Sequence, residues 1–179
     1  MQIKAAIVIA AVTGAALSAP TSKSECTPMY EGELKYEASF AGGRGGDESG
    51  VVVHKDGKLQ VKLQTENKPH EEHGTSDVKH GTAVKFEKCS KVDDPRGNVM
   101  GRIVLKKGNK CIVPDGEAAL RVDECSKKAE FLVAREEEEG YLLVMAENRK
   151  LFNRGKDDEL GLVPTGGVLS SSLEIWGGN

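Results

Sequence analysis

Residues 101–124 read GRIVLKKGNKCIVPDGEAALRVDE and lead directly into Cys125. Two short apolar runs, 103–105 and 111–113, flank a polar turn that contains glycine, which is typical of a β-hairpin. The alternating segment 120–122 predicts a further strand. This single stretch therefore contains three predicted strands.

A similar pattern occurs once before this stretch and once after it. Residues 50–59 (GVVVHKDGKL) read as the same hairpin with a shorter turn, and residues 140–151 (GYLLVMAENRKL) as a third copy with a longer turn. The return segments also correspond, because 83–89 (AVKFEKC) matches 119–125 (ALRVDEC). We therefore interpret the chain as three diverged repeats.

The fold class follows from this repetition. No segment keeps a helical apolar period for three turns, and about twelve short strands are predicted, four in each repeat. The repeats cover roughly residues 26–89, 90–131 and 132–179. Because no copy can bury its strands alone, the three copies should share one core. We predict a single all-β domain, a barrel capped by three hairpins, which is the β-trefoil arrangement.

The N-terminus has the composition of a secretory signal peptide. Lys4 precedes the apolar run 5–17, and small residues follow, so we expect cleavage after Ser18 and a mature domain of residues 19–179. The apolar run is too short to be a stable membrane anchor. We therefore expect a secreted, extracellular protein without membrane insertion.

Composition narrows the choice of partner. The net charge is −3, and basic residues are interspersed with acidic ones. This pattern argues against nucleic acid or an anionic membrane as the main partner. The four glutamates at 136–139 repel one another and should form an exposed turn.

All four cysteines lie in the predicted mature domain, where a secreted chain should pair them. Four cysteines allow three connectivities. In the repeat alignment, Cys111 and Cys125 bound one unit, and Cys89 takes the place of Cys125 in the preceding copy, where Leu59 replaces Cys111. We therefore expect a Cys111–Cys125 bridge and, by elimination, a Cys26–Cys89 bridge. A metal site is disfavoured because no C-x-x-C pair is present.

Two polar loops suggest other chemistry. Residues 41–50 are rich in glycine, but the lysine and hydroxyl residue of a phosphate-binding loop are absent, which favours a flexible loop. Residues 65–81 contain histidines and carboxylates that could gather around a metal, namely His70, His73, His80, Glu71, Glu72 and Asp77. Their spacing is not that of a helical zinc site, so a solvated loop is favoured. We expect no metal and no cofactor.

An enzyme is the least favoured class. The sequence shows no Ser/His/Asp or Cys/His constellation and no paired carboxylates in an apolar setting. All cysteines are expected to be oxidised, which removes them as nucleophiles.

The central repeat also resembles a known family. The features that carry the likeness are Gly101-Arg102-Ile103-Val104, Lys110-Cys111-Ile112, Cys125 and Phe131. They resemble the ricin B-type lectin family and, more closely, a group of small fungal secreted β-trefoil-like proteins. In that family a Gln-x-Trp motif closes each repeat, and its tryptophan packs into the shared core. The matching positions here hold Glu130 and Phe131 in the middle copy and end at Trp176 in the last, so we expect Trp176 in the core.

The resemblance implies a way to bind carbohydrate. Lectins of this family use an aspartate shortly after the first cysteine of a repeat, a stacking aromatic ring and an asparagine. The aspartate position corresponds to Val61, Val113 and Asn153 in the three copies. Only the third copy keeps a polar side chain, with Asp157 and Tyr141 as candidate neighbours. The alternative is that Asn153 is only a turn residue.

Two functions are consistent with this sequence. The first is a secreted lectin-like binding module for a glycan or for another ligand on a cell surface or cell wall. The alternative is a secreted β-trefoil protease inhibitor, or an effector-type interaction protein, that acts on another protein through the exposed loops 41–50 and 65–81. Flexible loops cost affinity when they insert as substrate mimics, which favours the first function.

Overall fold

The computed structural model describes residues 26–40, 48–64, 80–91, 97–147, 150–163 and 168–177. The predicted signal peptide and most of the two polar loops, with His70 and His73, lie outside the described residues. No helix in the described part of the chain is long and apolar enough to cross a membrane.

The described residues form an all-β structure with twelve strands and two short 3-10 helices. The strands are β1 (Thr27–Phe40), β2 (Glu48–Lys55), β3 (Lys58–Leu63), β4 (Ala83–Lys91), β5 (Val99–Leu105), β6 (Cys111–Asp115), β7 (Ala119–Asp123), β8 (Leu132–Glu136), β9 (Tyr141–Ala146), β10 (Leu151–Arg154), β11 (Leu160–Val163) and β12 (Val168–Trp176). The 3-10 helices are η1 (Lys127–Ala129) and η3 (Lys156–Asp158).

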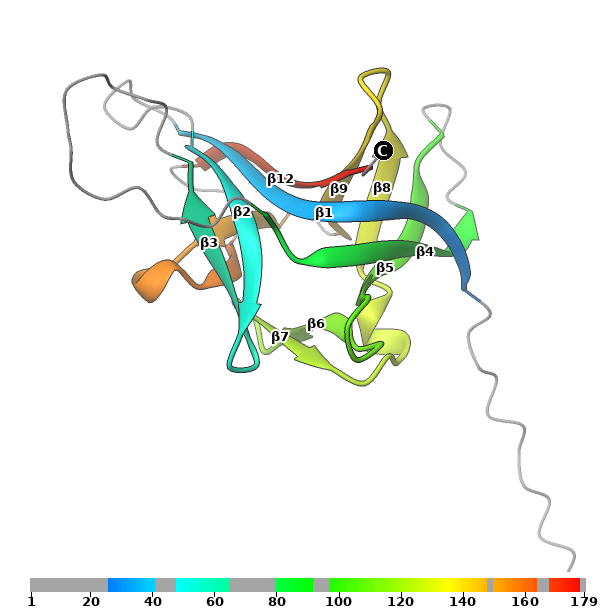
Figure 1. Cartoon of the computed structure of the whole chain (residues 1–179), viewed down its shortest axis with the longest axis horizontal. Coiled ribbons are helices and arrows are strands. Elements are labelled where there is room, and N and C mark those ends of the chain that lie inside the picture. The colour runs from blue at the N-terminus through cyan, green and yellow to red at the C-terminus, as the bar shows by residue number, and fades with distance from the viewer. Residues whose placement is uncertain are drawn as a thin grey trace, which may run out of the picture.

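Six of the strands close into an antiparallel barrel (Figure 1). The order of neighbours is β1, β4, β5, β8, β9 and β12, and β12 pairs again with β1. The closing ladder places Leu34 opposite Ile175 and Tyr36 opposite Leu173. Closure satisfies the backbone hydrogen bonds that an open sheet leaves exposed at its edges.

The other six strands form three two-stranded ladders, β2–β3, β6–β7 and β10–β11. These hairpins contact one another: Gly161 of β11 pairs with Ala119 of β7, and Gln60 of β3 forms a bridge with Glu159. The three hairpins therefore pack together as a unit beside the barrel.

One apolar core unites the barrel and the hairpins. Strand alternation turns Leu34, Tyr36 and Ala38 of β1 inward, whereas Lys35 and Glu37 lie on the outer face. The largest fully buried side chains are Tyr36, Phe86, Phe152, Leu34, Leu59, Ile103, Leu105, Ile112, Leu132, Leu142, Leu173 and Ile175. They come from strands along the whole described chain, so no third of it has a core of its own.

One predicted hairpin forms with a short ladder, and another is wrong. The runs 103–105 and 111–113 are antiparallel neighbours joined by the pair Val104–Cys111 and by a hydrogen bond from the Leu105 N–H to the Lys110 carbonyl oxygen, while β5 pairs along its length with β4 and also with β8. In the predicted hairpin 140–151, β9 pairs with β8 and β12, and no ladder joins it to β10 within the described residues. After β7 the chain forms η1 before β8 begins at Leu132.

Two disulfides link Cys26 to Cys89 and Cys111 to Cys125, the two pairs that the sequence predicts. The first joins the residue before β1 to β4, and the second joins β6 to the segment after β7. Both are compatible with an extracellular protein.

Candidate functional site

The three predicted carbohydrate-binding residues lie in two places. Asn153 is half-buried in β10 and pairs with Gly161 of β11, and Asp157 is exposed in η3 of the same hairpin. Tyr141 lies at the start of β9, where it pairs with Trp176 of β12. The structure therefore brings Asn153 and Asp157 to one hairpin and places Tyr141 on the barrel.

Asn153 borders a hollow of about 320 Å³ between the second and third hairpins, which we call the hairpin hollow. Its polar side chains are Asn153, Lys156 and Glu159, and residues 118–120 and 160–163 form a mainly apolar wall. Amide, ammonium and carboxylate groups together donate and accept hydrogen bonds, while the wall can cover C–H groups. This is the chemistry that a polyhydroxylated ligand requires. Neither Asp157 nor Tyr141 lines the hollow.

A glycine sets how closely the two hairpins approach at this hollow. A Cβ on Gly161 would lie 2.5 Å from the carbonyl oxygen of Ala118. The Leu162 N–H donates a hydrogen bond to that same carbonyl at 2.7 Å. The absence of a side chain at Gly161 therefore allows the two hairpins to approach closely at the hollow.

Charged groups hold the third hairpin against the first. Arg154 donates to both carboxylate oxygens of Glu48, at 2.6 and 3.1 Å, and to Asp158 at 2.9 Å. Lys62 lies 3.3 Å from the other oxygen of Asp158. The hydrogen bond from Arg154, together with the charge of Lys62, lowers the pKa of Asp158, although desolvation opposes this shift. Asp157 and Asp158 both adopt the left-handed region, at φ 59° and 62°.

An aromatic pair occupies the outer face of the barrel. The rings of Tyr141 and Trp176 are stacked with centroids 4.9 Å apart. The Lys35 ammonium lies 4.1 Å from the centroid of the Trp176 ring, and the Trp176 indole N–H donates to Glu174 at 2.7 Å. Trp176 covers one face of the Tyr141 ring, so that face cannot stack on a sugar.

The expected core position of Trp176 is wrong. Alternation along β12 sends Leu173 and Ile175 into the barrel, so Glu174 and Trp176 lie on the outer face, where Trp176 stays partly exposed. Phe131, the matching aromatic of the middle copy, is partly buried and packs against the core.

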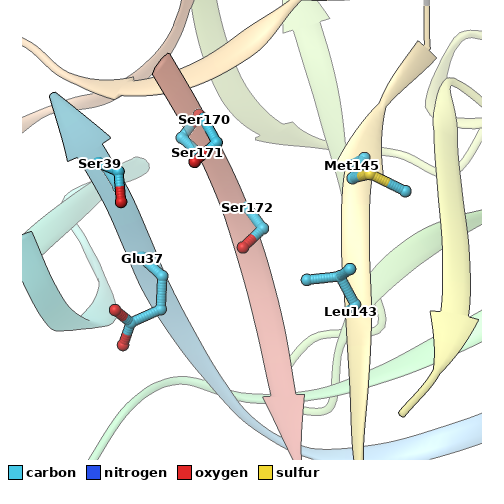
Figure 2. Close-up of a pocket in the computed structure, with 8 residues that line it drawn as sticks. Glu37, Ser39, Leu143, Met145, Ser170, Ser171 and Ser172 are labelled. Atoms are coloured by element: carbon cyan, nitrogen blue, oxygen red, sulfur yellow. The ribbon is translucent and has the colours of Figure 1, made fainter. Parts of the chain in front are cut away.

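A second hollow, of about 340 Å³, lies on the outer face of the barrel across β1, β12 and β9, and we call it the wall hollow (Figure 2). Glu37 in its lining accepts a hydrogen bond from the Ser49 hydroxyl at 2.6 Å. Burial raises the pKa of the neighbouring Glu174, and the charge of Glu37 adds to this effect. The side chains that line the hollow include Glu37, Ser39, Leu143, Met145, Ser170 and Ser172.

Sequence reasoning missed the wall hollow. One signal was present, because alternation in β12 puts Ser170, Ser172 and Glu174 on one face. The partners of these residues, Glu37 and Leu143, are distant in sequence and become neighbours only through barrel closure.

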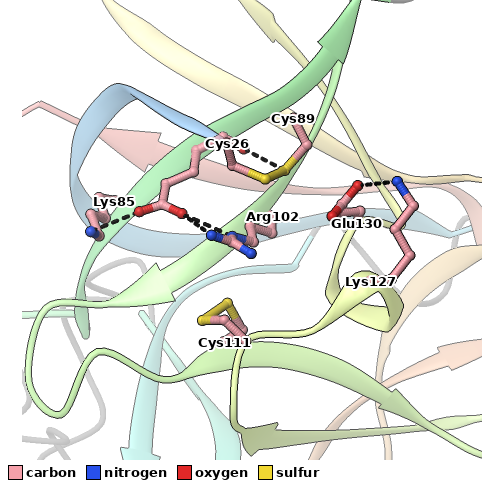
Figure 3. The surroundings of a disulfide bond; sticks show 9 residues. Cys26, Lys85, Cys89, Arg102, Cys111, Lys127 and Glu130 are labelled. Atoms are coloured by element: carbon pink, nitrogen blue, oxygen red, sulfur yellow. Dashed lines mark hydrogen bonds and ion pairs between the residues drawn. A yellow bond between two sulfur atoms is a disulfide. The ribbon is translucent and has the colours of Figure 1, made fainter. Parts of the chain in front are cut away.

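A buried ion cluster lies near the Cys26–Cys89 bridge (Figure 3). The Glu87 side chain is 9% exposed and forms a salt bridge with Lys85 at 2.7 Å. It also accepts two hydrogen bonds from Arg102, at 2.7 and 2.8 Å. Desolvation favours the neutral acid, but the hydrogen bonds from Lys85 and Arg102 outweigh it, so the pKa of Glu87 is lowered. The cluster places two cations on one carboxylate and joins β4 to β5.

Potential metal-ligating side chains meet beside the Cys26–Cys89 bridge. Among the described residues, Cys26, Cys89 and Glu130 bring potential ligand atoms within 4.8 Å of one another. Both sulfurs are in the disulfide and cannot bind a metal as thiolates, and Glu130 is paired with Lys127 at 2.5 Å. His80 lies 3.1 Å from Glu33. The expectation of no metal in loop 65–81 stays a prediction.

Comparisons with known proteins do not assign a family. No family model, curated protein or solved structure matches this chain. Functional assignment therefore depends on the chemistry of the described residues.

Proposed function

We propose that the protein is a secreted, lectin-like binding module with a β-trefoil fold, related to the ricin B-type lectins, and that it binds carbohydrate at the hairpin hollow. The trefoil assignment is supported by strand order. The first and fourth strands of each successive set of four enter the barrel, and the second and third form a hairpin. This division groups β1–β4, β5–β8 and β9–β12.

The proposed division changes the repeat alignment. In copies two and three, the aligned runs cover the first and second strands of the set, as the sequence alignment assumed. In copy one, the aligned run 50–59 covers β2 and β3, which are the second and third strands of the set. The second boundary would fall between β8 and β9, after residue 136 instead of 131. Val61 in β3 would then not be the first-copy equivalent of Asn153 in β10.

The observation that carries the ligand class is the position of Asn153. Its amide borders a hollow that also contains Lys156 and Glu159 beside an apolar wall. Sugars present alternating hydroxyl and C–H groups, and such a mixed lining can satisfy both. Secretion is supported by the two disulfides and by the signal-like N-terminus.

A screen of purified mature protein against glycans and cell-wall polysaccharides tests this function. We expect binding of at least one sugar class and an approximately tenfold loss of affinity in Asn153→Ala, since one hydrogen bond contributes about 1 kcal/mol or somewhat more. Asn109→Gly is the matched control, because it removes an exposed amide from the left-handed turn before β6. Binding of no sugar, or equal binding by Asn153→Ala, would refute the proposal. Inhibition of a protease panel by a protein that binds no sugar would favour the interaction-protein alternative.

A further inference from the structure

The wall hollow is a second site with a different character from the hairpin hollow. It lies across three strands that are contiguous in the barrel, with Glu37 and Ser39 from β1, Ser172 from β12 and Leu143 and Met145 from β9 (Figure 2). The register places Glu37 directly opposite Ser172, and Glu174 opposite both Lys35 and Leu143. No residue is shared with the hairpin hollow.

Negative charge gathers at this site. Among the described residues, neither Glu37 nor Glu174 has a salt bridge, and Glu174 is 9% exposed. The charge of Lys35 offsets part of the negative charge at Glu174, and its ammonium lies over the Trp176 ring. Two carboxylates on adjacent strands, neither of them in a salt bridge, form a local field that favours a positive ligand.

The rest of the lining suits a cation on an aliphatic stem. Leu143 and Met145 offer an apolar floor, and Met is well suited to irregular apolar contacts. The serine hydroxyl oxygens can accept hydrogen bonds from those N–H groups of the cation that do not bond to a carboxylate.

We propose that the wall hollow binds an arginine or lysine side chain of a polypeptide partner, with Glu37 as the principal charged contact. The stem of the basic residue packs on Leu143 and Met145, and its cationic head lies between Glu37 and the serines of β12. A sugar fits this site less well, because the two aromatic rings nearby are stacked on each other. The site would recruit a basic protein segment independently of any glycan at the hairpin hollow.

The chain contains its own reporter for this test. Trp176 is the single tryptophan, and its indole N–H donates to Glu174. Titration with an acetylated, amidated peptide Gly-Ala-Arg-Ala-Gly at low ionic strength should change the tryptophan fluorescence and saturate. The same peptide with citrulline in place of arginine should bind at least about tenfold more weakly, because it lacks the charge.

Variants separate the contributions within the site. Glu37→Gln should weaken binding of the arginine peptide about tenfold while keeping an acceptor for Ser49. Glu117→Gln is the matched control, since it removes an exposed carboxylate from the turn after β6 and should leave affinity unchanged. Met145→Ala should weaken binding of the arginine peptide but not binding of free guanidinium ion, because the ion has no aliphatic stem to pack on Met145.

Three results would overturn the proposal: no saturable binding of the arginine peptide, equal binding of the citrulline peptide, or full affinity in Glu37→Gln. Asn153→Ala distinguishes this site from the carbohydrate proposal. It should weaken sugar binding about tenfold without changing peptide affinity, and either site can fail while the other stands.

Discussion

Gly101 of β5 is required by its neighbours on β4. A Cβ at this position would lie 2.2 Å from the Glu87 carbonyl oxygen and 2.5 Å from the ring of Phe86, which is fully buried. Neither the backbone nor a packed ring can move aside without disturbing the core. We therefore expect Gly101→Ala to lower the free energy of unfolding by at least about 2 kcal/mol, measured by urea denaturation.

Gly155→Ala is the control for this substitution. Gly155 has a φ of −83°, and its nearest neighbour to an added Cβ is the Glu159 carbonyl oxygen at 3.5 Å, an ordinary contact. Its free energy of unfolding should stay within about 0.5 kcal/mol of the wild-type value. Equal effects at Gly101 and Gly155 would show that β4 and β5 do not approach as closely as described.

Glu87 couples stability to pH. Its lowered pKa means that the ion cluster with Lys85 and Arg102 stabilises the fold above the ordinary carboxyl pKa of 4.5, and that this contribution is lost as pH falls through the lower folded-state value. Glu87→Gln should cost about 1–3 kcal/mol at pH 7, because it leaves Arg102 and Lys85 without their carboxylate. The difference between wild type and variant should shrink in acid.

Urea denaturation of both proteins at neutral and acidic pH measures this coupling. Glu117→Gln, at an exposed turn position, should behave as wild type throughout the range. A Glu87→Gln penalty that is the same at both pH values would assign the effect to packing instead of charge.

At the level of elements, sequence reasoning succeeded where the deciding interactions are local. The β2–β3 hairpin was predictable because Asp56 and Gly57 both adopt the positive φ, 51° and 79°, that a tight two-residue turn requires. It was incomplete for β5 with β6, whose ladder is a single pair, and it failed for β9 with β10, because barrel closure gives β5 and β9 other partners. Asn153 became a candidate through the repeat and the family resemblance, whereas the wall hollow combines strands from opposite ends of the described chain.

Arg154 fastens the third hairpin to the first. Its bonds to Glu48 and Asp158 are only partly exposed, with 27% of the arginine side chain accessible, so they should be stronger than surface pairs. Arg154→Leu should cost about 1–2 kcal/mol. Hydrogen exchange should accelerate at the amides of β10 and β11 more than in the barrel strands.

Arg121→Leu provides the matched comparison. Arg121 lies on β7 and pairs with Asp123 at 2.8 Å, but 52% of its side chain is exposed. Exposed pairs of this kind contribute about 0–1 kcal/mol. If both variants lose the same stability and hydrogen exchange at β10–β11 is unchanged, the charge network does not hold the hairpins together.

For the whole molecule, the decisive contact joins the two ends of the described chain. β1 pairs with β12, β2 and β4, so a single strand links barrel closure to the first hairpin. All of these pairings, apart from that with β2, span large sequence separations and must overcome a large loop-closure entropy. The Cys26–Cys89 bridge lies at the start of β1 and reduces that entropic cost before the barrel closes.

The two disulfides should therefore contribute unequally. They span 63 and 14 residues, for which chain entropy predicts about 4 kcal/mol and about 3 kcal/mol of stabilisation. The double variant Cys26→Ala/Cys89→Ala should lose more free energy of unfolding than Cys111→Ala/Cys125→Ala, as measured by urea denaturation of the mature protein. Cys111 is fully buried beside Val104 and Val113, so its replacement by alanine also loses packing. This loss reduces the difference in unfolding free energy between the two double variants. A larger loss from the shorter bridge would mean that packing around Cys111, and not restriction of the unfolded chain, determines what the disulfides contribute to the barrel.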